Sequence, residues 1–178
     1  MQGGWDAGRL VFLDETGLNT KLARLYGRAA AGQRCLGAVP HGHWHCSTFI
    51  MALRHDRLCA PWLLDGAMDG LAFLTCLRQC LRPELRAGDI VICDNLSTHK
   101  VAGVRETIAA AGATLRYLPA YSPDLNPIEQ AFAKLKAHLR AAAARTYESL
   151  PAATASSLET FRPSHCQGFF RHAQYETD

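Results

Sequence analysis

Three carboxylates in this chain stand where acidic side chains can meet. Asp14 follows the apolar run 10–13, Asp94 follows the apolar run 90–93, and Glu129 lies at the start of a helical pattern. Short apolar runs bounded by polar or glycine turns are typical of strands buried on both faces. Ligands of open α/β sheets gather at the carboxyl ends of such strands. The pattern therefore indicates a carboxylate cage for divalent metal, which is the equipment of phosphodiester chemistry.

Glu129 has a second interpretation that the segment alone leaves open. Asn126 is a suitable N-cap, and Pro127 suits the first helical position because its missing N–H would be unpaired there. Glu129 comes three residues after the cap, so it could complete a capping box by reaching back to the backbone of Asn126. Asp124 is expected to shape the turn before Asn126.

The helix that follows has an apolar stripe and a charged face. The stripe recurs at helical spacing and is expected to face the core; it consists of Ile128, Phe132, Leu135 and Leu139. Glu129, Lys136 and Arg140 share a different face. A carboxylate with cations farther along its own face suits a metal site beside a nucleic-acid backbone. For any one of these charges a solvated basic face is the commoner explanation.

Three long blocks of the sequence resemble the signature blocks of bacterial transposases of the insertion-sequence-630 family, within the mariner-like superfamily. The blocks are LVFLDETGLNT, GDIVICDNLSTHK and YLPAYSPDLNPIEQAFAKLKAHLR, and the closing GFFRHAQY resembles the C-terminal tail of that family. In such transposases the blocks carry a DDE triad, which falls here on Asp14, Asp94 and Glu129. The 34 residues between Asp94 and Glu129 are typical of the group.

The resemblance implies a fold, a reaction and a set of partners. The fold would be α/β and RNase H-like, a mixed five-stranded sheet flanked by helices, with residues 1–178 forming a single catalytic domain. The triad would hold two Mg²⁺ ions, with Mn²⁺ as a substitute, and would cleave and transfer DNA strands. The partners would be the inverted-repeat ends of a transposon and a target DNA, bound by a homodimer.

The helix-turn-helix region that precedes the first block in full-length relatives has no counterpart in this sequence. We therefore expect recognition of transposon ends to need a separately encoded N-terminal DNA-binding module. Two other functions stay open: an inactive remnant or non-catalytic DNA-binding relative, and an RNase H-like nuclease that acts on RNA–DNA hybrids.

Supporting roles are predicted for residues around the triad. Asn95 and His99 could orient Asp94 or contact a phosphate, or they could cap the helix that starts near Val101. Asn126 is counted with them. Glu15 should point to the opposite face of its strand and is not assigned to the metal. The predicted DNA contacts are Lys100, Lys134, Lys136 and Arg140.

Charge is distributed unevenly along the chain. The formal net charge of +3 is low for a nucleic-acid-binding protein. Residues 21–60 nevertheless hold a basic set with only Asp56 opposed to it: Lys21, Arg24, Arg28, Arg34, Arg54 and Arg57. Arg145 adds a further charge to the helix after Glu129. Basic patches beside an acidic pocket are what a DNA strand passing over metal ions requires.

A rival metal site is suggested by the histidines of the segment His41-Gly42-His43-Trp44-His45. On a strand these three side chains would share a face and could bind zinc or copper, but no second cluster completes a tetrahedron. The seven cysteines are an odd number without a CxxC pair, so we expect reduced thiols and neither a disulfide framework nor a zinc knuckle.

Composition agrees with a globular enzyme domain. The 178 residues are 48% hydrophobic and 20% charged, which is ordinary for such a domain. No apolar stretch approaches the roughly 20 residues that span a bilayer, and the N-terminus does not resemble a signal peptide. The sequence therefore indicates a cytoplasmic protein.

Hydrophobic periodicity predicts the elements that must position the carboxylates. Strands are expected near 9–13, 21–28, 43–53, 58–64, 89–93 and 113–118, and helices near 69–81, 101–111, 127–144 and 149–160. Early neighbouring strands followed by alternating strands and helices indicate a mixed sheet.

Overall fold

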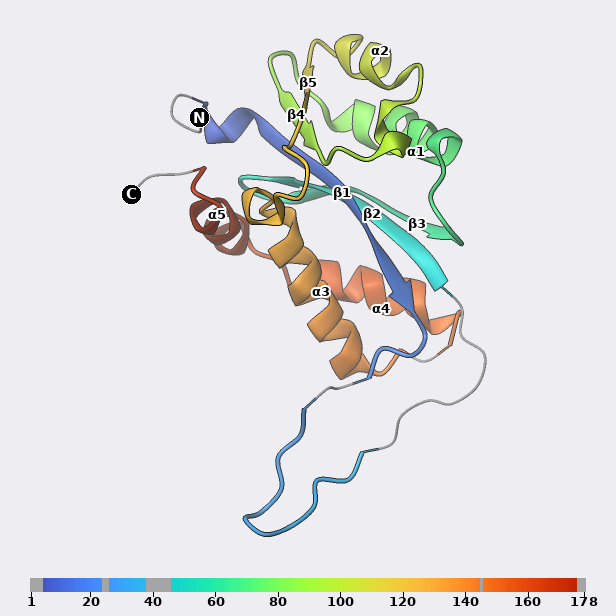
Figure 1. The fold of residues 1–178 in the computed structure, drawn as a ribbon, viewed down its shortest axis with the longest axis vertical. Helices are drawn as coiled ribbons and strands as arrows, with labels where there is room; N and C mark the ends of the chain where they lie inside the picture. The colour runs from blue at the N-terminus through green and yellow to red at the C-terminus, as the bar shows by residue number, and fades with distance from the viewer. Residues whose placement is uncertain (1–4, 24–25, 38–45, 145, 176–178) are drawn as a thin grey trace.

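The computed structural model describes residues 5–23, 26–37, 46–144 and 146–175, and a five-stranded sheet forms its centre (Figure 1). The strands lie in the order β3-β2-β1-β4-β5. Their bounds are β1 Leu10–Asn19, β2 Cys46–Arg54, β3 Leu58–Asp65, β4 Ile90–Cys93 and β5 Thr114–Tyr117. The pairs β3–β2 and β2–β1 are antiparallel, whereas β1–β4 and β4–β5 are parallel. The predicted mixed five-stranded sheet is confirmed.

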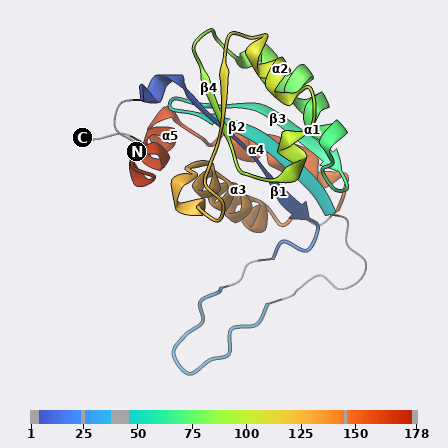
Figure 2. The same cartoon turned by 45° about the horizontal axis from the view of Figure 1, so that its top comes forward.

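Helices cover both faces of this sheet (Figures 1 and 2). One face carries α1 Gly70–Cys76, continued by a π-helical turn over Leu77–Leu81, and α2 Val104–Ala109. The other face carries α3 Ile128–Ala142, α4 Ser149–Leu158 and α5 Pro163–His172. Each face therefore has its own hydrophobic core.

The alternation of side chains along β1 explains why this strand is apolar without interruption at its start. Leu10 and Phe12 belong to the core beneath α3 and α5, whereas Val11 and Leu13 belong to the core beneath α1 and α2. All four are almost fully buried. A central strand with both faces covered has no solvent side on which polar residues would be favoured.

Two strand predictions are wrong in detail. β1 does not end before Asp14 but continues to Asn19, because residues 14–19 pair with β2, from Asp14 opposite Met51 to Asn19 opposite Cys46. No strand forms over the described part of 21–28. Since β2 and β4 already occupy the two edges of β1, that segment has no edge of β1 left to pair with.

The helix predictions agree better with the structure. The patterns at 127–144 and 149–160 correspond to α3 and α4. The helix expected from 101 begins only at Val104, after Gly103 with its φ of +92°. The helix α5 was missed. Its Phe170 packs edge-to-face on Phe12 of β1, with ring centroids 5.4 Å apart.

All seven cysteines are free thiols, and Cys59, Cys76, Cys93 and Cys166 are buried. Within the part of the chain that the structure describes, no helix combines the length and the apolar character that crossing a bilayer requires.

Candidate active site

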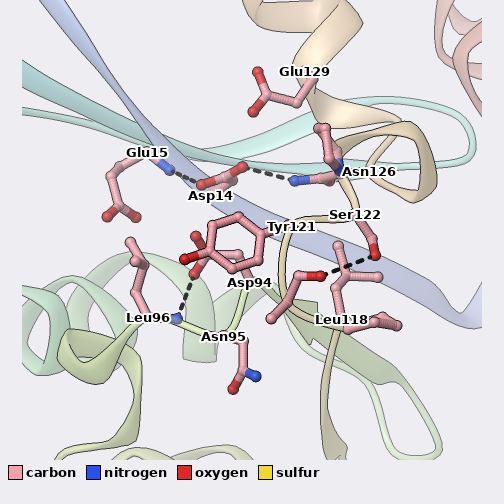
Figure 3. A pocket seen from close by; sticks show the side chains of 13 residues that line it. Asp14, Glu15, Asp94, Asn95, Leu96, Leu118, Tyr121, Ser122, Asn126 and Glu129 are labelled. Atoms are coloured by element: carbon pink, nitrogen blue, oxygen red, sulfur yellow. Dashed lines mark hydrogen bonds between the residues drawn. The ribbon is translucent and has the colours of Figure 1, made fainter.

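Three elements bring the predicted triad to one pocket. Leu13 of β1 lies beside Cys93 of β4 in the parallel register, so the residues that follow, Asp14 and Asp94, emerge from adjacent strands. Glu129 lies in the first turn of α3. All three line a pocket of about 470 Å³, which is closed on another side by the loop that joins β5 to α3 (Figure 3).

Asp14 forms the buried floor of this pocket. Its side chain accepts hydrogen bonds from the Glu15 backbone N–H to Oδ1 and from Asn126 Nδ2 to Oδ2, both at 2.7 Å. Burial raises the pKa of Asp14 to about 7, and the charges of Glu15, Asp94 and Glu129 add to that rise, although the backbone hydrogen bond opposes it. Among the described residues, no lysine, arginine or histidine pairs with this carboxylate.

Asn126 is not the helix cap that the sequence suggests. The N-cap of α3 is Pro127, and no side-chain hydrogen bond caps this helix. The backbone oxygen of Asn126 accepts from the Glu129 N–H at 3.2 Å, while its amide turns to Asp14 (Figure 3). The capping-box interpretation is therefore wrong, because the Glu129 side chain lines the pocket.

His99 links Asp94 to the neighbouring strand. It is fully buried, and its Nε2 lies 2.8 Å from Glu15 Oε2. Its Nδ1 lies 2.6 Å from Asp94 Oδ1, at ion-pair distance but without hydrogen-bond alignment. The ring stacks on Phe73 with centroids 4.2 Å apart. The Tyr117 hydroxyl donates to the His99 backbone oxygen at 2.8 Å.

This arrangement gives Asp94 and His99 opposite pKa shifts. Burial disfavours a charged imidazole, but the contacts with Asp94 and Glu15 outweigh it and raise the pKa of His99 to about 9. Burial alone would raise the pKa of Asp94, but His99 and the Leu96 N–H outweigh it and lower that pKa. Asp94 is therefore held as a carboxylate, in contrast to Asp14.

The contacts distinguish between the alternatives for the supporting residues. His99 holds Asp94 and does not cap α2, whose N-cap is Gly103. Asn95 is exposed and lines the pocket. Glu15 follows Asp14 on β1 and also lines the pocket, although the sequence did not assign it to the metal. Its contact with His99 was missed, and the only signal in the sequence is its position beside Asp14.

The four predicted DNA contacts do not form one surface. Lys136 lies within electrostatic range of Glu129 and Arg140: partial burial lowers its pKa, Glu129 raises it and Arg140 lowers it. Lys134 instead lies 2.7 Å from His165 Nδ1 of α5 and does not line the pocket. Lys100 is exposed and lies 5.6 Å from the centre of the Tyr117 ring.

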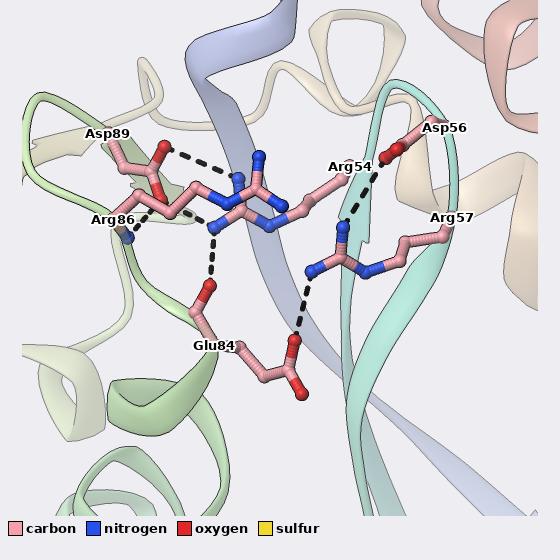
Figure 4. Close-up of polar contacts among 6 residues, drawn as sticks. All are labelled: Arg54, Asp56, Arg57, Glu84, Arg86 and Asp89. Carbon is pink, nitrogen blue, oxygen red and sulfur yellow. Dashed lines mark hydrogen bonds and ion pairs between the residues drawn. The ribbon is translucent and has the colours of Figure 1, made fainter.

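The basic set over residues 21–60 is partly reassigned by the structure. Arg54 is almost fully buried and pairs with Asp89, and Arg57 pairs with Glu84 (Figure 4). These two arginines therefore neutralise acids of the fold. Arg24 and Arg145 lie outside the described residues, as do the histidines of the rival metal site.

The triad fits a divalent metal by its chemistry. Within the described residues, no three His, Cys, Asp or Glu side chains are already gathered closely enough to hold an ion. The three carboxylates nevertheless supply hard oxygen ligands of the kind that Mg²⁺ prefers. Burial is the main cause of the raised pKa of Asp14, and the charges of Glu15, Asp94 and Glu129 add to it. A bound cation would favour the ionised form of this carboxyl group.

Comparison with known proteins identifies the family. A family model described as DDE superfamily endonuclease matches residues 9–151. The chain belongs to this endonuclease family. The match contains all three carboxylates of the predicted triad and ends before α5. No curated protein sequence matches the chain significantly.

Solved structures of Mos1 transposase share the fold. The paired-end complex with the left transposon end superposes with a TM-score of 0.72 at 19% identity, over 94% of this chain and 52% of that chain. The Mos1 paired-end complex with Mg gives 0.65 at 20% identity, over 94% and 54%. The Mos1 mariner catalytic domain gives 0.63 at 17% identity, over 95% and 79%. This DDE endonuclease therefore has the expected RNase H-like fold, and it spans about half the length of the transposase chains in the two complexes.

Proposed function

We propose that this chain is the catalytic domain of a transposase that cleaves DNA at transposon ends and transfers the cut strands. The observation that carries the proposal is the convergence of Asp14, Asp94 and Glu129 from β1, β4 and α3 on one pocket. Membership of the DDE superfamily endonuclease family supports the reaction class. The complexes of Mos1 transposase with a transposon end support DNA as the substrate.

The three carboxylates would hold two Mg²⁺ ions, and Mn²⁺ could replace them. When bound, such ions activate the attacking water or 3′-hydroxyl and stabilise the leaving oxygen. Asn126 keeps Asp14 in one orientation through its bond to Oδ2. His99, anchored by Glu15, does the same for Asp94. Fixing the ligands in advance lowers the cost of assembling the site on the substrate.

Charges along α3 suggest the path of the DNA backbone. Lys136 lies within electrostatic range of Glu129 and Arg140, which supports contacts of these two cations with phosphates beside the pocket. Lys100, which follows His99 in sequence, would contact the strand on the Asp94 side. Lys134 contributes least to this path, because it lies against His165 and the ring of Phe161.

The three sequence blocks that resemble transposase signatures support a more detailed assignment. They support membership of the insertion-sequence-630 family, a single catalytic domain over 1–178, and a homodimer that brings two ends and a target DNA together. A separately encoded N-terminal DNA-binding module would supply recognition of the transposon ends.

The test is metal-dependent cleavage and joining of labelled duplexes that carry the flanking inverted repeats. Wild type should cut and join in Mg²⁺, whereas Asp94→Asn should do neither. Asp124→Asn is the matched control, because Asp124 is exposed near the same pocket without lining it. Each protein is assayed with and without a supplied N-terminal DNA-binding module.

The same assay separates the alternatives. Cleavage of RNA–DNA hybrids without any joining of DNA would favour the RNase H-like nuclease. Inactivity of the wild type under every arrangement, while the protein stays folded, would favour the inactive remnant.

A further inference from the structure

Two exposed hydrophobic side chains stand at the mouth of the carboxylate pocket. Tyr121 is fully exposed, at 103%, and Leu96 is 49% exposed. Both line the same pocket as Asp14, Asp94 and Glu129 (Figure 3). Tyr121 comes from the loop between β5 and α3, whereas Leu96 comes from the segment after β4. The pocket therefore has a charged, buried floor and an apolar, exposed rim.

The backbone holds Tyr121 outward. Its φ of +56° lies in the left-handed region, which is uncommon for a residue other than glycine. Such conformations cluster at functional sites, where the surrounding structure keeps them in place. Pro119 and Pro123 flank the position and fix two further φ angles of the same loop. The ring is thus presented by a restrained loop, and at full exposure it has no packing role in the fold.

The depth of Asp14 indicates what the rim would meet. Asp14 is only 6% exposed, so a phosphodiester that reaches it must descend below Tyr121 and Leu96. The base of the adjoining nucleotide then stays at the level of the rim. Every base has a π-face, and aromatic side chains in nucleic-acid sites stack on it without regard to sequence.

We propose that Tyr121 stacks on the nucleobase next to the phosphodiester that enters the carboxylate pocket, with Leu96 packing against the same nucleotide. The proposal deepens the transposase function and rests on it, because it identifies a residue that positions the DNA. A base that stacks on Tyr121 has left its neighbours in the duplex. The site therefore favours DNA that is already unpaired or distorted at that nucleotide, since less unstacking is then required.

The test couples a change in Tyr121 to a change in the DNA. Affinity for a labelled end duplex is measured by fluorescence anisotropy in the Asp94→Asn background, in which no strand is cut. Tyr121→Leu removes the ring and should weaken binding about tenfold, within the range for loss of one stacked base. Tyr121→Phe keeps the ring and should bind like the parent. Two further duplexes each carry one abasic nucleotide, on one side or the other of the scissile phosphate. On one of these duplexes, the proteins with Tyr121 and with Tyr121→Leu should bind with the same affinity.

Thermal unfolding separates this role from a structural one. Tyr121→Asn should unfold at or above the temperature of the parent, because asparagine tolerates a positive φ and the ring packs on nothing. The proposal is overturned if Tyr121→Leu binds intact DNA like the parent, or if it weakens binding equally to intact DNA and to both abasic duplexes. It is also overturned if the main effect of Tyr121→Leu is on the sedimentation of the protein, because Tyr121 would then belong to an interface between copies. Failure of strand cleavage by the wild type would count against the transposase function while leaving this binding result independent.

Discussion

Two buried aspartates of the same sheet have opposite surroundings. Asp89 immediately precedes β4 and is 3% exposed. Its Oδ2 lies 2.5 Å from Arg54 Nη2 and accepts the Arg86 N–H at 2.7 Å (Figure 4). Asp14 is 6% exposed, and its charged neighbours are the carboxylates Glu15, Asp94 and Glu129. The strand β4 separates the two kinds of site, with Asp89 at its start and Asp94 after its end.

The charges around a buried aspartate distinguish a structural role from a functional one. A buried ion pair with its hydrogen bonds made is complete within the fold, and removing one partner is costly. A buried carboxylate among other carboxylates destabilises the fold unless it is protonated or a cation arrives. The charges of Arg54 and Asp89 therefore balance each other within the fold, although Arg54 Nε has no hydrogen-bond partner among the described residues. The Asp14 pocket is instead prepared for an ion.

The largest effect should come from removing a charge of the triad. Asp14→Asn and Asp94→Asn should each lower the rate of DNA cleavage by about a thousandfold or more, because metal ions contribute several kcal/mol to stabilisation of such a transition state. Single-turnover cleavage measures the effect. Asp124→Asn should retain the wild-type rate, and a comparable loss in that variant would show that the assay reports general damage.

Breaking the structural pair should cost stability instead. Asp89→Asn leaves Arg54 buried without its partner, so the free energy of unfolding should fall by about 3–5 kcal/mol. Urea titration measures the fall. The double variant Arg54→Met, Asp89→Asn should recover part of it, because the unpaired charge is then gone. If Asp89→Asn is as stable as the wild type, the contrast between the two aspartates is lost.

The pH dependence of stability should identify Asp14 in the metal-free protein. Its folded pKa of about 7 exceeds the usual 3.8, so between these values the native state binds more protons than the unfolded state. The contribution of Asp14 to stability is therefore lost as pH rises from about 4 to 7, at up to about 1.4 kcal/mol per pH unit. Urea titrations in EDTA should show this slope reduced in Asp14→Asn.

Mg²⁺ should offset the loss of stability at high pH, because only the ionised carboxylate binds metal. The rise in melting temperature on adding Mg²⁺ should be larger at pH 8 than at pH 5.5. An equal rise in Asp14→Asn would place the bound ion elsewhere.

The smallest effect should come from weakening the contacts that hold Asp94 in place. Glu15→Gln removes a charge that holds His99, so Asp94 is fixed less firmly and affinity for Mn²⁺ should fall about tenfold, at the low end for residues that orient metal ligands. Calorimetric titration of the DNA-free protein measures this affinity. Asp56→Asn is a control remote from the pocket. Unchanged affinity in Glu15→Gln would remove His99 and Glu15 from the positioning role.

The sequence predicted the convergence of the triad better than the contacts around it. The runs before Asp14 and Asp94 are apolar enough to identify two strands, and the resemblance of the three blocks pointed to Glu129. The continuation of β1 past Asp14 was missed because pairing with β2, not local composition, carries the strand to Asn19.

Side-chain direction could not be predicted where one residue type suits two roles. Asn126 is as suitable for a cap as for a bond to Asp14, and only the placement of α3 against β1 decides between them. The contact of His99 with Glu15 joins residues 84 positions apart. The sequence assigned Arg54 to a basic patch because its partner Asp89 is 35 positions away. Long-range pairings of this kind leave no local pattern.

Anomalous diffraction from crystals grown with Mn²⁺ would show whether the triad binds metal. We expect two peaks in the pocket, with oxygens of Asp14, Asp94 and Glu129 as ligands and His99 still against Asp94. No peak in the pocket at a Mn²⁺ concentration that supports DNA cleavage, or a peak bound by other residues, would contradict this expectation.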